Sequence, residues 1–197
     1  MKRFVINFCL VLFIMSGAFS GPFGLEKGMT LYEVKAACKG RVELIDDDCY
    51  KITPPKTHPK FDKYIVWIDS DVGLYYIKAI TADIHTNGYG TELKNKFMEI
   101  LSPLDNKYGK FKLIDYIEPS SLWDYDRYWV MGLCQGDRIC FAYCSRENDN
   151  KLPEDINFIE LTIKADYSDT GYIALEYELS NNDEIKTKKQ ERDEDTF

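Results

Sequence analysis

Three cysteines, Cys134, Cys140 and Cys144, lie within the segment LCQGDRICFAYC, and this spacing could serve a metal ion, a redox reaction or disulfides. Structural zinc sites take four Cys or His ligands, usually as two close pairs, and His58 and His85 are both distant in the sequence. A redox motif needs two cysteines separated by two residues. The spacing therefore predicts no metal site and no cofactor, and leaves disulfides or reduced core cysteines.

The first twenty residues have the three-part layout of a secretory signal peptide. Lys2 and Arg3 precede a mostly apolar run, and small residues lead to a cleavage point before Gly21. The apolar run is shorter than the roughly twenty residues that a membrane helix requires. We therefore expect residues 1–20 to be removed, and the remaining chain to be exported, periplasmic or secreted, without stable membrane insertion.

Export makes disulfides the default use of the cysteines. Cys140 and Cys144 are four residues apart on a predicted strand, about 13 Å at 3.3 Å per residue, which is too far for a bond between them. Cys38 and Cys49 could close a local loop around a turn. We predict that Cys38 pairs with Cys49, and that Cys134 pairs with Cys140 or with Cys144, so that one thiol stays unpaired.

The charge of the chain argues against nucleic-acid binding. Without Lys2 and Arg3, the 25 basic residues become 23 against 33 acidic residues, a net charge of −10. An acidic surface repels phosphate backbones, and no basic stripe with interleaved aromatic residues is present in the sequence. We therefore expect no nucleic-acid partner; for an exported chain, the expected partner is a protein of the cell envelope.

Few residues have the types and spacing of a catalytic site. Asp83 and His85 share one face of a predicted strand and could form an acid–base pair beside the loop 87–90. A solvated strand edge is the alternative interpretation of the same alternation. Neither a serine in a glycine elbow nor a cysteine with a placed base occurs, so the sequence favours a non-enzymatic protein without deciding the question.

The richest aromatic stretch is WDYDRYW, residues 123–129. Trp123, Tyr125, Arg127 and Trp129 are residue types that protein interfaces use as anchors, although one face of a helix here must also pack in the core. These four residues form the candidate contact surface. A second motif, DSDVG at 69–73, resembles the start of a calcium loop, but the positions that need glycine and glutamate hold other residues, so it predicts a hairpin turn.

Helical spacing and caps predict helices over about 31–39, within the segment 90–110, where Ser102-Pro103 should end, kink or restart the helix, and over about 122–133. Alternating segments predict strands between them. Runs of strands separated by single helices indicate an α+β fold, with a mainly antiparallel sheet and two or three helices packed on one face. The glycine- and threonine-led starts of the first two helices also suggest two related halves.

We expect a single domain over residues 21–180. The last segment, 181–197, is almost entirely charged or polar, and this composition predicts a disordered charged tail.

Five segments together resemble a group of exported bacterial proteins whose function is not established: FGLEKGMTLYEVK, NKYGKF, SSLWDYD, LPEDINFIELTI and IALEYEL. The resemblance spans most of 21–180 and implies no catalytic residues. The first helix, with Gly28, Met29, Thr30, Glu33 and Val34, is also similar to the start of the beta-lactamase-inhibitor-protein and outer-membrane-assembly-lipoprotein folds. Those folds pack two helices on a small antiparallel sheet and act by binding proteins, although this chain lacks a lipidated cysteine after its signal.

Two functions are thus expected from the sequence. The favoured one is an exported, non-enzymatic protein-binding or envelope-associated module, whose sheet face or aromatic helix contacts another macromolecule. The alternative is a periplasmic or secreted hydrolase with an unrecognised active site, for which Asp83, His85 and the loop 87–90 are the candidates.

Overall fold

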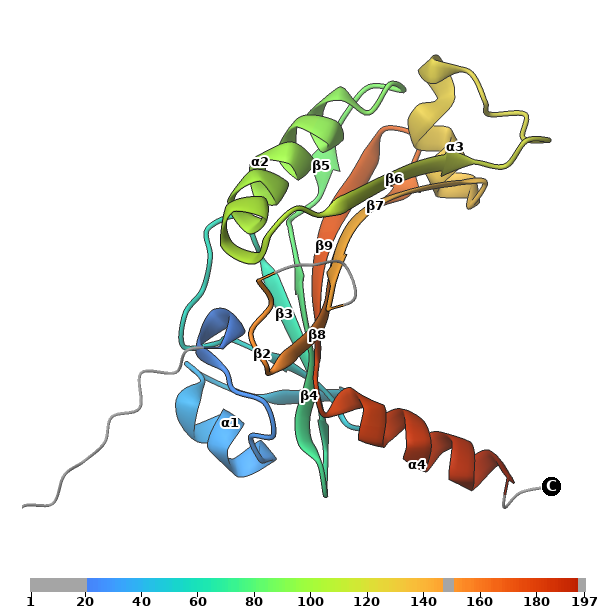
Figure 1. Ribbon diagram of the computed structural model, residues 1–197. Coiled ribbons are helices and arrows are strands. Elements are labelled where there is room, and N and C mark those ends of the chain that lie inside the picture. Colours follow the sequence, from blue (N-terminus) through green and yellow to red (C-terminus); the bar gives the residue numbers. More distant parts are fainter. Residues whose placement is uncertain (1–20, 147–150, 195–197) are drawn as a thin grey trace, which may run out of the picture.

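An antiparallel sheet of nine strands forms the body of the protein in the computed structural model, which describes residues 21–146 and 151–194 (Figure 1). The strands are β1 (Glu43–Asp46), β2 (Cys49–Ile52), β3 (Lys63–Asp69), β4 (Gly73–Ile80), β5 (Ile84–His85), β6 (Lys112–Ile117), β7 (Arg138–Ser145), β8 (Ile156–Tyr167) and β9 (Thr170–Leu179). The helices are η1 (Pro22–Gly24), α1 (Leu31–Ala37), α2 (Thr91–Tyr108), η2 (Asp126–Tyr128), α3 (Trp129–Gln135) and α4 (Asn182–Glu194).

The order of the strands divides the sheet into two halves with the same plan. Neighbours run β1-β2-β3-β4-β9-β8-β7-β6, with β5 paired to β9. Each half is therefore a helix followed by a four-stranded antiparallel meander, α1 with β1 to β4 and α2 with β6 to β9. The halves join through their last strands, β4 and β9. The predicted α+β fold with a mainly antiparallel sheet is confirmed.

Helix α1 begins as its sequence predicts. The Thr30 hydroxyl accepts a hydrogen bond from the backbone N–H of Glu33, and the Glu33 carboxylate accepts one from the backbone N–H of Thr30 at 2.8 Å. These two bonds satisfy N–H groups that the first turn of a helix leaves unpaired. Val34 is fully buried beneath the helix and fixes it to the sheet.

Helix α2 continues through Pro103, so the predicted end or restart of the helix at Ser102-Pro103 is wrong. A proline removes the bond to the carbonyl four residues earlier, here Glu99. The Lys60 ammonium donates to the freed Glu99 carbonyl at 3.4 Å, and so replaces part of the lost bond. The buried side of the helix also continues past the proline, and consists of Leu93, Phe97, Ile100, Leu101, Leu104 and Tyr108.

The helix predicted over 122–133 is wrong in its first half. Residues 119–125 form turns, and α-helix begins only at Trp129, after the short helix η2. The Ser121 hydroxyl accepts from the backbone N–H of Trp123 at 3.0 Å and donates to Asp137 at 2.7 Å. Such local side-chain bonds compete with helix formation, and Leu122, expected on the inner face, is 81% exposed.

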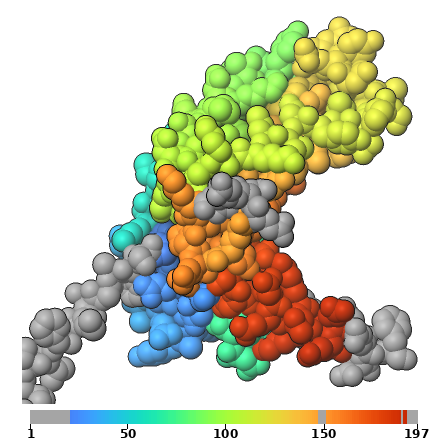
Figure 2. Space-filling model, in the orientation of Figure 1, coloured from blue at the N-terminus to red at the C-terminus, as the bar shows by residue number. Residues whose placement is uncertain are grey.

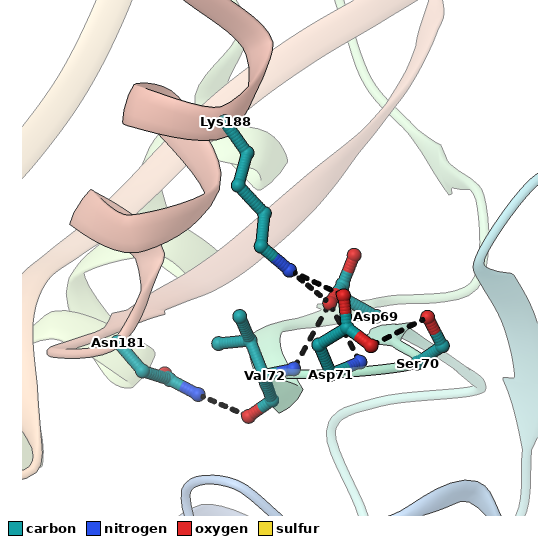
Figure 3. A network of polar contacts seen from close by, with 6 residues as sticks. All are labelled: Asp69, Ser70, Asp71, Val72, Asn181 and Lys188. Carbon is teal, nitrogen blue, oxygen red and sulfur yellow. Dashed lines mark hydrogen bonds and ion pairs between the residues drawn. The ribbon is translucent and has the colours of Figure 1, made fainter. Parts of the chain in front are cut away.

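The predicted disordered tail is also wrong over residues 182–194, which form α4. Composition did not reveal its anchors, which come from distant strands: Ile185 is buried, and the Lys186 ammonium lies 2.6 Å from the Glu178 carboxylate. Further along, Lys188 reaches the turn between β3 and β4, at 3.2 Å from Asp69 and 2.8 Å from Asp71 (Figure 3). The sheet therefore holds this polar helix.

Figure 1 shows the helices distributed over both faces of the sheet. α1 and α2 lie on one side, and α4 leaves the other side at the end of β9. Within the described ranges, none of the helices is long and apolar enough to cross a membrane. The predicted signal peptide, residues 1–20, lies outside the described residues.

Candidate functional site: the open face of the sheet

The sheet has one face covered by helices and one face largely open. Residues opposite each other on neighbouring strands share a face. One row across five strands is covered and at most 4% exposed, and it consists of Val66, Ile77, Tyr177, Ile159 and Cys144. The adjacent row on the other face is half-buried, and it consists of Trp67, Tyr76, Glu178 and Phe158. We call the second side the open face.

Aromatic rings gather on the open face where β7 and β8 meet. The rings of Tyr143 and Phe158 stack with their centroids 5.7 Å apart, and Phe141 lies 6.0 Å from Tyr143. Tyr116 and Ile139 extend this surface to the sheet edge and are each 45% exposed. Exposed apolar patches on a sheet face mark interaction sites more often than isolated exposed residues do.

Carboxylates form the centre of the open face. Glu160 on β8 stands directly opposite Glu176 on β9, and Glu178 follows two residues later on the same face. Like charges in opposite positions destabilise a sheet. The Lys78 ammonium, 2.8 Å from Glu176, offsets part of this repulsion.

Neutral hydroxyl groups hold two of these carboxylates in place. Thr162 donates to Glu160 at 2.5 Å, and Tyr76 donates to Glu176 through a short hydrogen bond. Burial, followed by the bond to the Glu176 carboxylate, raises the pKa of Tyr76 far above its usual value. Tyr76 is therefore a neutral donor at neutral pH. Among the described residues, no cation pairs with Glu160.

Two hollows adjoin the carboxylates on either side of Lys186. One has a volume of about 420 Å³ and is lined by Trp67, Tyr76 and Glu176, and the other, of about 570 Å³, is lined by Tyr143, Phe158 and Glu178. Figure 2 shows the molecule hollowed between α4 and the arm that carries β7. The open face is therefore a concave surface with aromatic walls and a partly uncompensated negative centre.

The predicted contact surface at 123–129 is divided by the structure. Tyr125 is 64% exposed, and the Arg127 guanidinium lies over the Tyr128 ring at 4.7 Å from its centroid. Trp123 is half-buried and packs against Tyr128 at 5.6 Å. Trp129 is only 2% exposed, so its assignment to a contact surface is wrong.

Trp129 belongs to the packing of the covered face. Its indole N–H donates to Asp115 at 3.0 Å, and Arg138 donates to the same carboxylate at 2.6 Å. The Lys94 ammonium lies over the Trp129 ring at 4.1 Å. Burial lowers the pKa of Lys94, and the position of the ring near Gly90 fixes α3 against the start of α2.

His85 and Asn87, two of the candidate catalytic positions, are hydrogen-bonded to neighbouring elements. His85 shares a hydrogen bond of 3.1 Å with the Thr170 hydroxyl, and Asp83 is exposed. Asn87 accepts from the backbone N–H groups of Tyr89 and Thr91, and so organises the start of α2. These contacts give the loop 87–90 a structural role, because they form the start of helix α2.

All five cysteines of the described residues are free thiols in the structure. Cys134 donates to the Asp166 carbonyl at 3.4 Å, and Cys144 donates to the Tyr108 carbonyl at 3.7 Å. Burial, followed by the Asp115 carboxylate, raises the pKa of Cys140 to about 12. Cys140 and Cys144 do lie on one strand, β7. The pairing of Cys38 with Cys49, and of Cys134 with a β7 cysteine, stays a prediction.

The segment DSDVG forms a hairpin turn, as its sequence predicts. Asp69 accepts from the backbone N–H groups of Asp71 and Val72, each at 2.9 Å, and the Lys188 ammonium lies beside both carboxylates (Figure 3). In the part of the chain that the structure describes, no three Cys, His, Asp or Glu side chains gather closely enough to hold a metal ion.

Sequence reasoning named a sheet face as one option but did not select its residues. The alternation of Phe158, Glu160 and Thr162 with buried aliphatic residues was visible, but the side that the helices cover was not. Searches against protein-family models, curated proteins and solved structures gave no match to this chain.

Proposed function

We propose that this chain is an exported, non-enzymatic protein that binds another protein through the open face of its sheet. The observation that carries the proposal is the direct opposition of Glu160 and Glu176 on a face walled by aromatic rings. Such an opposition costs stability, and a cation from a partner would relieve it. Function is a common reason for retaining an unfavourable arrangement on a folded surface.

The chemistry of the face supports a partner of a particular kind. Its aromatic wall at Tyr143 and Phe158 suits an apolar or aromatic side chain, and the carboxylates beside it suit Lys or Arg. We therefore infer a protein partner that presents a basic side chain next to apolar ones. An ion pair of this kind strengthens as the surrounding water is removed.

A capture experiment with matched variants tests this function. The chain from Gly21 to Phe197 is used as bait in envelope extract with chemical cross-linking and quantitative mass spectrometry. The bait is compared with the double variant Tyr143→Ala, Phe158→Ala, and with Tyr32→Ala, a control on α1 where Tyr32 is 81% exposed. We expect a protein that the original bait and Tyr32→Ala enrich and that the double variant does not.

The salt dependence of binding and the pattern of capture decide whether the proposal holds. Binding of the purified partner should weaken with added salt, because screening reduces the attraction between exposed charges. Equal capture by all three baits would contradict the proposal, provided that circular dichroism shows the double variant to be folded.

A further inference from the structure

A separate cavity lies on the covered face, away from the carboxylates of the open face. It has a volume of about 380 Å³ and lies between the N-terminal turn η1, the loop 56–61 and the second half of α2, with β9 beneath. In Figure 1 the blue N-terminal turn is below the C-terminal end of α2. Ligand sites of small molecules typically have volumes of about 300 to 1,000 Å³ and mostly apolar walls.

The inner wall of the cavity is aromatic. The ring of Phe23 lies within a T-shaped cluster, at 6.0 Å from Phe61, 5.0 Å from Tyr64 and 5.9 Å from Tyr177, measured between centroids. Ile100 and Leu104 of α2 complete the apolar lining. The hydroxyl of Tyr177 is hydrogen-bonded to Tyr108, and burial keeps its pKa well above the usual value, so the floor carries no charge.

The local backbone holds Phe23 in an uncommon conformation. Its φ of 56° and ψ of 19° are left-handed, which costs a non-glycine residue about 1 kcal/mol or more. Gly21 makes the turn possible, because a Cβ there would lie 1.8 Å from the Leu25 carbonyl oxygen. The wall that Phe23 forms is therefore built into the folded chain.

The mouth of the cavity is basic, although the whole chain has a net charge of −8. Lys56, His58, Lys60 and Lys107 line it, against a single acidic residue, Glu99. Lys60 and Lys96 already neutralise Glu99, at 2.8 Å and 3.4 Å. Burial, followed by the charge of Lys60, lowers the pKa of His58, so this imidazole is neutral at pH 7.

Lys107 is the cation at this mouth that is available for a ligand. Within the described residues it has no carboxylate partner, and its ammonium lies over the Tyr108 ring at 4.6 Å from the centroid. An ammonium without a carboxylate partner beside an apolar cavity complements a ligand with one negative charge and an apolar body.

From this complementarity we infer that the cavity binds a small amphipathic carboxylate, with its apolar tail among Phe23, Ile100 and Leu104 and its carboxylate at Lys107. The site is independent of the proposed protein-binding face. The tail removes apolar surface from water, and the ammonium supplies a charge-assisted hydrogen bond.

Binding of decanoate by the chain from Gly21 to Phe197, measured by isothermal titration calorimetry, tests the inference. Decanol and decyltrimethylammonium, which have the same tail with a neutral or cationic head, serve as comparison ligands. We expect decanoate to bind at least about tenfold more tightly than either, because a hydrogen bond to a charged group contributes about 1.5 to 3 kcal/mol. Equal affinities for the three compounds would overturn the inference.

Charge reversal locates the site. Lys107→Glu should weaken decanoate binding about tenfold or more, whereas Lys35→Glu on the exposed side of α1 makes the same change of charge and should leave binding unchanged. A similar loss in both variants would show a general charge effect and refute the site. The double variant Tyr143→Ala, Phe158→Ala should still bind decanoate, so this inference and the proposed protein binding can fail separately.

Discussion

Ile159 and Phe158 are neighbours on β8 and lie on opposite faces of the sheet. Ile159 is fully buried under the helices, whereas Phe158 is half-buried and stacks on Tyr143. The covered face consists of aliphatic and aromatic side chains in close contact, and the open face consists of aromatic rings and charges. The difference indicates that the covered face supplies most of the apolar burial that stabilises the fold, while the open face keeps aromatic rings and charges partly in water.

Substitution of each of these two residues by alanine tests the comparison most strongly, because it should give the largest difference in stability. Ile159→Ala should lower the free energy of unfolding by about 3 kcal/mol, because it removes buried methyl groups and leaves a cavity. Phe158→Ala should lower it by only about 1 kcal/mol, because the ring is still partly in water. Urea unfolding followed by tryptophan fluorescence measures both values. Equal losses would show that both faces contribute alike to stability.

The ion pair of the covered face provides the next test. Arg138 is 9% exposed, and its Nε has no hydrogen-bond partner among the described residues. Its Nη1 lies 2.6 Å from Asp115, which is 37% exposed. Asp115→Ala should cost about 2 kcal/mol, less than for a fully buried pair because water already reaches the carboxylate.

The control for this pair is Glu176→Gln on the open face. Glu176 contacts Lys78 at 2.8 Å but also opposes Glu160, so removal of its charge should change stability by less than about 0.5 kcal/mol. A larger loss from Glu176→Gln than from Asp115→Ala in urea unfolding would reverse the ranking of the two faces.

Local signals predicted the elements whose contacts are local. Thr30 and Glu33 three residues later predicted the start of α1, and apolar alternation predicted β7, β8 and β9. The same kind of reasoning did not predict that α2 continues past Pro103, because the donor that contacts the freed carbonyl is Lys60 on a distant loop. It was also wrong at 182–194, where the ammonium of Lys188 reaches a turn more than a hundred residues earlier.

The candidate site was hard to predict for a related physical reason. Alternation shows that Phe158, Glu160 and Thr162 share a face, but not whether a helix covers that face. Trp129 had the type of an interface anchor, and only tertiary packing against Asp115 and Gly90 places it inside. Residue types at a fixed spacing therefore identified candidate binding residues. Which of them are exposed for binding depends on which face of the sheet the helices cover.

Removal of the charge of Glu160 should separate stability from binding. Glu160→Gln ends the opposition to Glu176 and should raise the free energy of unfolding by about 0.5 kcal/mol. The same variant should capture less of the proposed basic partner, which is the usual cost of stabilising a functional surface. Parallel urea unfolding and quantitative capture test both parts. A destabilised variant with unchanged capture would contradict the role given to this carboxylate.

Removal of the contact between Lys188 of α4 and the turn after β3 should have the smallest effect on stability. The Lys188 ammonium contacts Asp69 and Asp71 at the surface, so Lys188→Ala should lower the free energy of unfolding of the whole chain only slightly. It should nevertheless increase hydrogen exchange in α4, because the helix has few other anchors. Lys164→Ala, at an exposed position of β8, is the control that should leave this exchange unchanged.

The contact between Lys188 and Asp69 should weaken at low pH. Burial by itself would raise the pKa of Asp69, but the N–H groups of Val72 and Asp71 and the Lys188 ammonium lower it overall. A carboxyl group whose pKa is lowered by folding stabilises the folded state above its unfolded pKa of about 3.9, and that contribution is lost as the pH falls through the lowered value. Exchange protection of α4, corrected for intrinsic rates, should therefore fall below about pH 4 in the original chain. It should fall less in Lys188→Ala, because that variant has already lost part of the contact, and an identical decline in both chains would show that the turn does not hold the helix.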